Sequence, residues 1–412
     1  MKKIFPLILV IILIFITALS IFYMHSESPK PVTENTISQN APIQNNFVNL
    51  ETIKEKSTST PKTIQAIIPT DTSITLAVTG DIMCHNTQFK DAFSNGVYDF
   101  SYVFSDIEKY LKSADIAIGN LETTFAGNGK PYDGYPAFNT PEALAYDLAE
   151  AGFDIITTSN NHSLDTGYNG LESTLNFLDD AGLSHIGTSR SIEEQITPLI
   201  KDVNGVKIAF LSYTYGTNGI PIPSGKEYCI NLIDKDLILS HLNIAKAESP
   251  DIICVSMHWG EEYMLTPNDT QKELTDFLFE NGVDIIFGNH PHVLQPLEHR
   301  NITLPDGTTK EGLVIYSLGN LISGQVKENT RTSSIITLKL TKKAAINKIT
   351  FDEIIYTPIY TYTSPKYKNY KILDIQQTLY NFESKNNSNI SNETYQLLQN
   401  ELKKVNNLYL SY

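Results

Sequence analysis

With 412 residues, of which 41% are hydrophobic and 10% aromatic, the chain can bury a large core and form two domains, or one large domain with appendages. Its 46 acidic residues outnumber the 31 basic ones, and the net charge of -15 argues against a nucleic-acid partner because an acidic surface repels the phosphate backbone. The three cysteines contain no CxxC pair and indicate neither a disulfide framework nor a thiolate zinc site.

The N-terminus carries an uncharged apolar run over residues 4–24, preceded by Lys2 and Lys3. A helix of that length, at about 1.5 Å per residue, reaches across the roughly 30 Å core of a bilayer. The two lysines favour a cytoplasmic N-terminus. We therefore predict that residues 1–24 are a single-pass transmembrane signal anchor in the cell membrane, with the main domain extracytoplasmic. A cleaved signal peptide is the alternative, because residues 17–20 include small side chains.

Residues 25–72 are rich in Ser, Thr, Asn, Pro and Gln and show no sustained periodicity. Such a segment cannot bury enough apolar surface to offset its ordering entropy, so we predict a flexible extracytoplasmic tether. The globular domain is predicted over residues 73–364. Residues 365–412, rich in Tyr, Asn and Lys, are predicted to be a C-terminal extension with one helix at residues 392–405.

From residue 73 onward, short apolar runs alternate with helical patterns, which predicts an α/β domain with mainly parallel strands in its middle. The strands are predicted at residues 74–78, 116–118, 155–158, 206–211, 252–257, 285–287, 313–317 and 334–340. The helices are predicted at residues 103–111, 141–151, 170–181, 235–247 and 267–281. Polar residues gather where the strands end, which is where open α/β sheets bind ligands.

The first two strands are each followed by candidate ligands. Asp81 comes after the strand at 74–78, and His85 stands four residues later, so a carboxylate and an imidazole could bind one cation. Asn120 and Glu122 follow the strand at 116–118 and project to the same side of an extended chain. Each pattern alone also fits a turn or a polar loop.

Asn161 and His162 follow the strand at 155–158. Because neighbouring side chains of an extended chain point in different directions, the Asn161 amide oxygen could bind metal while His162 faces a substrate. Asp165, three residues later, either orients that imidazole or caps a turn.

The last two clusters contain three histidines. His258 follows the strand at 252–257 beside the only tryptophan, and a structural histidine is the alternative reading. His290 and His292 flank Pro291 after the strand at 285–287, and this spacing aims two imidazoles the same way. Carboxylate, amide and imidazole ligands without thiolates indicate Mn, Fe or Zn rather than calcium.

The order of these motifs, Gly-Asp, Asn-Leu-Glu, Asn-Asn-His, His-Trp-Gly and Gly-Asn-His-Pro-His, resembles the CapA family of poly-γ-glutamate capsule synthesis proteins. That family is similar to the calcineurin-like metallophosphatase superfamily. The segment at residues 316–320 also matches, and the resemblance runs from about residue 73 to about residue 322. It implies a layered, metallophosphatase-like α/β sandwich with a metal site at the C-terminal ends of its strands, preceded here by one transmembrane helix.

The resemblance further implies two divalent metal ions. The implied ligands are Asp81, Glu122, Asn161, His258, His290 and His292. Asp81 would share one ion with a histidine of the His-Pro-His motif, and Asn161 would share the other with His258. Glu122 is the expected bridge between the ions, where the wider superfamily has an aspartate.

The resemblance also gives roles to the remaining histidines of the clusters. His162 is expected to donate a proton or to stabilise charge on the substrate, with Asp165 beside it. His85 stands two residues later than the superfamily would place a histidine, so it is kept as an additional ligand candidate.

The implied function is synthesis, export or processing of poly-γ-glutamate at the cell surface by a metal-dependent hydrolase or transferase. Its partners would be poly-γ-glutamate or another anionic polymer, membrane synthase subunits and the membrane itself. Two alternatives stay open: a general extracytoplasmic metal-dependent phosphoesterase, and a non-catalytic scaffold subunit that binds the polymer beside its synthase.

Overall fold

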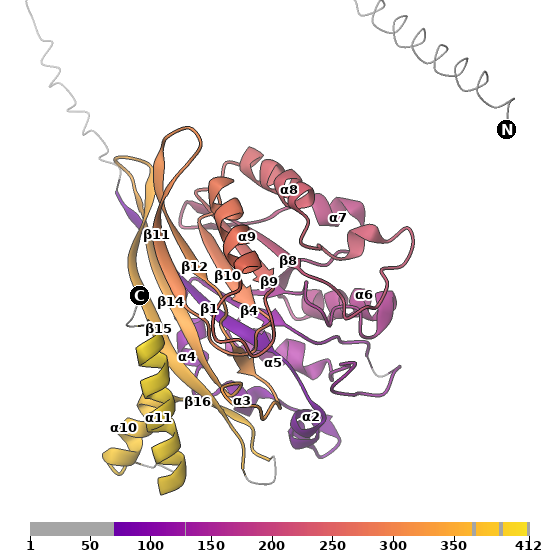
Figure 1. Cartoon of the computed structure of the whole chain (residues 1–412). Helices are drawn as coiled ribbons and strands as arrows, with labels where there is room; N and C mark the ends of the chain where they lie inside the picture. Colours follow the sequence, from indigo (N-terminus) through magenta and orange to yellow (C-terminus); the bar gives the residue numbers. More distant parts are fainter. Residues whose placement is uncertain (1–69, 128, 365–367, 387–389, 410–412) are drawn as a thin grey trace, which may run out of the picture. The chain divides into compact units, whose positions relative to one another are not determined.

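The computed structural model describes residues 70–127, 129–364, 368–386 and 390–409. Figure 1 shows their elements, which keep its labels below. The predicted anchor at residues 1–24 lies outside the described residues, as does nearly all of the predicted tether. Among the helices within these ranges, none combines the length and the apolar character needed to cross a bilayer.

The first sheet has eight strands. They are β1 (Thr72–Ile82), β4 (Ile116–Leu121), β5 (Ile155–Thr157), β6 (Ser184–Ile186), β13 (Asn320–Ile322), β14 (Thr332–Lys343), β15 (Lys348–Tyr362) and β16 (Lys371–Asp374). Their order is β16-β15-β14-β1-β4-β5-β6, and β13 pairs with the C-terminal end of β1. The pairs β1/β4, β4/β5 and β5/β6 are parallel, whereas β14, β15 and β16 add antiparallel strands on the other side of β1.

The second sheet has six strands. They are β7 (Leu199–Val203), β8 (Val206–Thr214), β9 (Ile252–His258), β10 (Ile285–Asn289), β11 (Leu297–Thr303) and β12 (Thr309–Ile315). Their order is β11-β12-β10-β9-β8-β7. The four inner strands are parallel and the two edge strands are antiparallel hairpin partners, so the expected parallel pairing in the middle of the chain is confirmed. A separate short hairpin joins β2 (Phe93–Ser94) to β3 (Val97–Tyr98).

The two sheets pack face to face and helices cover the outer face of each, but the last two helices pack on the inner face of the first sheet, where Tyr360 lies on the same side of β15 as Tyr356. The helices are α2 (Asn86–Ala92), α3 (Ser101–Phe104), α4 (Glu108–Lys112), α5 (Ala143–Ala151), α6 (Gly167–Asp180), α7 (Ile192–Ile196), α8 (Lys235–Ala247), α9 (Asp269–Glu280), α10 (Ile375–Glu383) and α11 (Asn392–Tyr409), with a 3-10 turn η1 (Glu227–Cys229).

Period-two alternation in the strands produces these layers. In β1, Ile74, Leu76 and Val78 join the core between the sheets, while Ala77 joins the core under α2 to α6. Residues of β8 and β9 alternate in the same way between the inner core and a third cluster under α8 and α9. The layered α/β architecture is therefore confirmed, and Figure 1 shows the long strands β14 and β15 alongside β1.

Several element boundaries differ from the expectations. The helix expected at residues 103–111 is two short helices, because Ile107 N–H bonds to the Phe104 carbonyl three residues back (2.9 Å) and interrupts the α-helical pattern. Pro141 and Pro267 precede α5 and α9 instead of lying in their first turns; Asn268 caps α9. The C-terminal part contains two helices and not one, because α10 and α11 both pack against β15 and β16.

Candidate metal centre

Asp81 lies near the C-terminal end of β1, directly after Gly80, where there is no room for a side chain. A Cβ on Gly80 would lie 1.8 Å from the Gly319 carbonyl oxygen, and the Asp81 N–H donates to that same oxygen (2.9 Å). The Asp81 carboxylate is fully buried. Its Oδ1 accepts from Asn120 Nδ2 (2.7 Å), and its Oδ2 lies 3.1 Å from His292 Nδ1.

The segment at residues 316–320 also touches β10, so it joins the strand ends of the two sheets. A Cβ on Gly288 would lie 1.9 Å from the Tyr316 carbonyl oxygen, and Leu318 N–H donates to Gly288 O (3.0 Å). The indole N–H of Trp259 donates to Tyr316 O (3.0 Å), which gives the only tryptophan a structural role. The close packing of this segment fixes the ends of β1 and β10 side by side.

Glu122, directly after β4, carries an unusual carboxylate. Its side chain is 0% exposed, and neither oxygen has a hydrogen-bond partner among the described residues. His258 Nε2 and His292 Nε2 lie 3.6 and 3.8 Å from Glu122 Oε1. Burial, and then the neighbouring Asp81, raise the pKa of Glu122 well above its ordinary value. An uncompensated buried carboxylate costs on the order of several kcal/mol, so this position calls for a cation.

His290 and His292 are held in left-handed backbone conformations on either side of Pro291, with φ of 94° and 59°. Such conformations cost on the order of 1–3 kcal/mol each outside glycine and gather at functional sites. This strained turn, and not the extended alternation expected from the sequence, brings the two rings within 5.9 Å. Burial lowers the pKa of His290 to about 3, which keeps its imidazole neutral, and its Nδ1 has no hydrogen-bond partner within the described ranges.

His258 is the last residue of β9, and its Nε2 lies 2.7 Å from the Asn161 Oδ1 that follows β5. Both side chains are buried. Burial, and then the neighbouring His290 and His292, hold the pKa of His258 well below its ordinary value. The imidazole is therefore neutral at pH 7, which is the form that binds a metal.

The carboxylates and imidazoles gather in two overlapping groups. Glu122, His290 and His292 offer ligand atoms within 4.8 Å of one another, and so do Asp81, Glu122 and His258. Glu122 belongs to both groups, as a bridging carboxylate would. Two contacts agree with the pairing implied by the resemblance, because Asp81 Oδ2 lies 3.1 Å from His292 Nδ1 and His258 Nε2 lies 2.7 Å from Asn161 Oδ1. The groups add that His258 also lies near Asp81 and that His290 lies near His292.

His162 and Asp165 form a buried pair beside these groups. His162 Nδ1 lies 2.7 Å from Asp165 Oδ2, and that oxygen also accepts the Phe138 N–H (2.7 Å). Of the two roles left open for Asp165, the geometry gives it the contact with the imidazole. On its other side, His162 Nε2 lies 3.5 Å from Asn218 Nδ2.

His85 belongs to neither group. Its Nδ1 accepts the Gly324 N–H (3.1 Å), and its ring lies against Phe138 with centroids 5.1 Å apart. Burial lowers the pKa of His85 to about 4. His85, the additional ligand candidate, therefore lies beside the site, where it holds the loop after β13.

Two asparagines outside the implied ligand set orient candidate ligands. Asn120 donates to Asp81, and Asn320 Oδ1 lies 3.0 Å from His292 Nδ1. Contacts of this kind fix the orientation of metal ligands. The sequence already pointed to Asn120 beside Glu122, whereas Asn320 was missed although it ends the matched segment at 316–320.

Tyr215 and Asn218 were also missed. They follow the end of β8, so the criterion applied to the other strand ends would have found them. The Tyr215 ring lies 4.6 Å from that of His290, and Asn218 Oδ1 accepts from Asn161 Nδ2 (3.1 Å).

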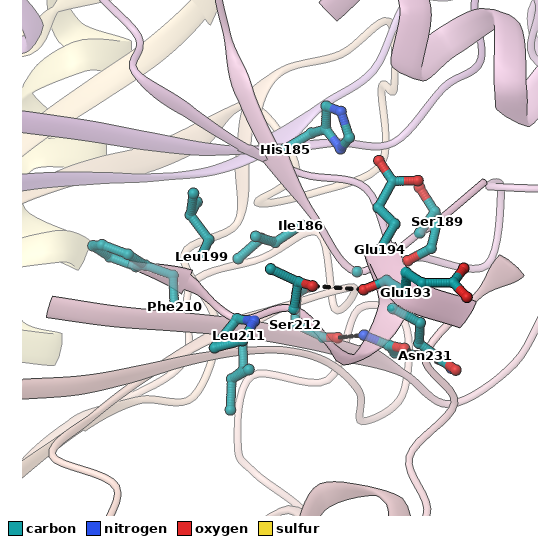
Figure 2. Close-up of a pocket in the computed structure, with 15 residues that line it drawn as sticks. His185, Ile186, Ser189, Glu193, Glu194, Leu199, Phe210, Leu211, Ser212 and Asn231 are labelled. Atoms are coloured by element: carbon teal, nitrogen blue, oxygen red, sulfur yellow. Dashed lines mark hydrogen bonds between the residues drawn. The ribbon is translucent and has the colours of Figure 1, made fainter. Parts of the chain in front are cut away.

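A cavity of about 350 Å³ lies between β6, β7, β8 and α7 and is lined by none of the candidate ligands (Figure 2). In its wall, Asn231 Nδ2 donates to the Ser212 carbonyl (3.2 Å). Ser212 Oγ lies 2.7 Å from Ser159 Oγ, two residues before Asn161. The cavity therefore borders the loop that carries Asn161 but is separate from the metal ligands.

The family described as "Bacterial capsule synthesis protein PGA_cap" matches residues 75–325, a range that contains all the candidate residues above. The capsule biosynthesis protein CapA of Bacillus anthracis is 30% identical over 272 residues, which cover 64% of this chain and 63% of that protein. The PGA biosynthesis protein CapA of Bacillus subtilis (strain 168) is 30% identical over 276 residues, which cover 66% of this chain and 69% of that protein. The match thus spans less than two thirds of the Bacillus anthracis protein.

Solved structures of similar arrangement include a phosphatase of Mycoplasma pneumoniae, at 16% identity and a TM-score of 0.42, covering 72% of this chain and 97% of that one. The calcineurin-like phosphoesterase YfkN of Bacillus subtilis has 15% identity and a TM-score of 0.43, covering 70% of this chain and 91% of that one.

Proposed function

The chain belongs to the bacterial capsule synthesis protein family PGA_cap, and on that basis we propose that it acts in the synthesis, export or processing of poly-γ-glutamate outside the cytoplasmic membrane. The names of the two Bacillus relatives, which refer to capsule and PGA biosynthesis, support this pathway. The polymer, or another anionic polymer, would be its substrate, with membrane-embedded synthase subunits as partners.

We further propose that the chain works as an enzyme with two divalent cations, Mn, Fe or Zn. The observation that carries this proposal is Glu122, a fully buried carboxylate that has no hydrogen-bond partner within the described ranges and that two ligand groups share. The donors fit such ions: two carboxylates, the Asn161 amide oxygen and three imidazoles, without a thiolate.

The chemistry would be hydrolysis or transfer at an amide or phosphoester bond. Bound cations would polarise the carbonyl or phosphoryl oxygen and make a hydroxide nucleophile available near neutral pH. Asp165 accepts the Nδ1–H of His162, which fixes the ring and leaves Nε2 for proton transfer with the substrate. The hydrogen bond from Phe138 N–H keeps the Asp165 oxygen an acceptor.

Metal analysis tests the assignment of the ligands. Full-length protein purified with Mn or Zn should contain close to two ions per chain, and the His290→Ala/His292→Ala double variant should lose at least one, because water replaces a nitrogen donor poorly. His299→Ala is the matched control, since His299 is a partly exposed histidine whose Nε2 lies 3.5 Å from Glu311. Retention of both ions in the double variant would contradict the site.

Alanine substitutions of the neighbours Asn161 and His162 should impair different properties, metal binding in the first case and turnover in the second. Asn161→Ala should weaken metal binding, and excess metal should restore part of its activity. His162→Ala should keep its metal and its fold but lose about 10²–10⁴ in turnover, the usual contribution of a proton-transfer group. Polymer production in cells carrying His162→Ala should fall as far as in a deletion. Normal polymer levels with metal-loaded His162→Ala would favour the non-catalytic scaffold.

A further inference from the structure

Asn218 lies in the loop after β8, where it is exposed at the edge of the candidate metal centre. Its φ of 51° is left-handed, a conformation that asparagine tolerates better than most residues. The loop is fixed on both sides of it. Tyr215 N–H donates to His258 O (3.0 Å), and Ile220 N–H donates to Thr217 O (2.9 Å). The Asn218 amide is therefore held next to Asn161 and His162.

The contact between Asn218 and Asn161 determines which end of the Asn161 amide faces the candidate metal ligands. Asn161 Oδ1 is 2.7 Å from His258 Nε2, and Asn161 Nδ2 is 3.1 Å from Asn218 Oδ1. A carbonyl oxygen only accepts hydrogen bonds, so a flipped Asn161 would set two acceptors against each other. Asn218 thus favours the orientation in which the Asn161 oxygen, the only end that can bind a cation, points to His258.

The same amide constrains the proton on His162. Because Asn218 Oδ1 is used by Asn161, its Nδ2 is the end that lies 3.5 Å from His162 Nε2. An amide NH₂ only donates, so His162 Nε2 is the acceptor and the ring proton is on Nδ1. The 2.7 Å contact between His162 Nδ1 and Asp165 Oδ2 requires the same tautomer. A chain of hydrogen bonds therefore runs from His258 through two asparagines to this imidazole.

We propose that Asn218 is a positioning residue that sets the metal-facing orientation of Asn161 and, through its Nδ2, supports the acceptor role of His162 Nε2 that the contact with Asp165 establishes. The proposal rests on the function proposed above, because it treats Asn161 as a ligand. It assigns Asn218 no contact with the reacting atoms. Its exposed position lets an incoming substrate displace the long contact to His162 without disturbing Asn161.

Two substitutions separate the two contacts. Asn218→Ala removes both, so the full-length protein should bind its weaker ion about 10- to 100-fold less tightly in chelator competition, the usual effect of losing a partner of a ligand. Asn218→Asp keeps an acceptor for Asn161 but cannot donate to His162 at neutral pH. It should retain metal affinity within a few-fold, because an acceptor for Asn161 remains. The ring ¹⁵N shift of His162 Nε2, assigned against His162→Asn, should change with the loss of its donor, while that of Nδ1 stays as in wild type. Both variants should lower kcat more than they change KM.

Asn204→Ala is the matched control, because Asn204 has nearly the same backbone conformation (φ 55°) in the turn between β7 and β8. It should leave metal affinity, ring shifts and kcat unchanged. Wild-type affinity in Asn218→Ala, together with an unchanged ¹⁵N shift of His162 Nε2 in Asn218→Asp, would overturn the proposal while leaving the proposed function intact. A wild-type protein that binds no metal would instead overturn the proposed function itself.

Discussion

Glu122 links the site to the stability of the protein. In the folded, metal-free chain, burial and the neighbouring Asp81 raise its pKa well above the ordinary value of 4.5. The folded protein then holds a proton that the unfolded chain has already released. The stability that this group contributes is therefore present below about pH 4.5 and is lost as the pH rises toward the folded-state pKa. Without metal, Glu122 therefore makes the fold less stable at pH 7 than it is below about pH 4.5.

We expect Glu122→Gln to make the metal-free protein more stable at pH 7, since the amide has nearly the same shape and does not ionise. The free energy of unfolding of wild type minus that of the variant should fall as the pH rises above about 4.5. Urea unfolding with a chelator at several pH values measures this difference. With metal present the order should reverse. Glu353→Gln, at an exposed ion pair with Lys339, is the control. A metal-free Glu122→Gln protein less stable than wild type at pH 7 would contradict the expectation.

Single residues at the strand ends could be predicted because local pattern determines them: a strand ends, and a polar side chain follows at the sheet edge. Asp81, Glu122 and the His-Pro-His motif are of this kind. Their grouping could not be predicted, because it depends on a strained turn at residues 290–292 and on contacts between residues far apart in sequence. Asn218 contacts Asn161 across the gap between two sheets, which no local pattern indicates.

At the scale of elements, the buried parallel strands were predictable because continuous apolar runs indicate them. Strands at or near the sheet edges were not. β7 is half-buried except for the exposed Asp202, and the first part of β15 mixes half-buried and exposed residues, so neither gives a clear apolar signal. Pairing with a neighbouring strand forms these elements, and that neighbour is visible only in the fold.

Gly80→Ala should disturb the metal site by separating β1 from the segment at 316–320. The new Cβ would lie 1.8 Å from Gly319 O, so β1 must move away from the segment at 316–320 and shift Asp81 with it. We expect a loss of about 1–3 kcal/mol or more in the free energy of unfolding, together with weaker metal binding. Gly129→Ala, where a Cβ meets nothing within 4 Å, should change neither. Unaltered metal affinity in Gly80→Ala would show that this packing does not position the carboxylate.

At the scale of the whole molecule, a chain beginning at Thr70 should fold and bind the same metal as the full-length protein. The described residues belong to one compact unit, Ile67–Tyr412, and Asp71 is already engaged, accepting the Ala344 N–H (2.9 Å). Circular dichroism, thermal unfolding and metal analysis check this. Aggregation of this chain, when one that begins at residue 25 is soluble, would contradict the predicted boundary. The membrane anchor at residues 1–24 stays a prediction.

The position of β1 has a consequence for the life of the nascent polypeptide. Its partner on one side is β14, in which Lys342 pairs with Thr72. This pairing cannot form until the ribosome has synthesised Lys342. At about 5–20 residues per second, the ribosome needs on the order of 10–60 s to supply that partner. During this interval the strand that carries Asp81 has an unpaired edge and an uncovered apolar face, which are the features that cause aggregation. Productive folding of this protein should therefore depend on chaperones that bind its first strands until the last third of the chain has emerged.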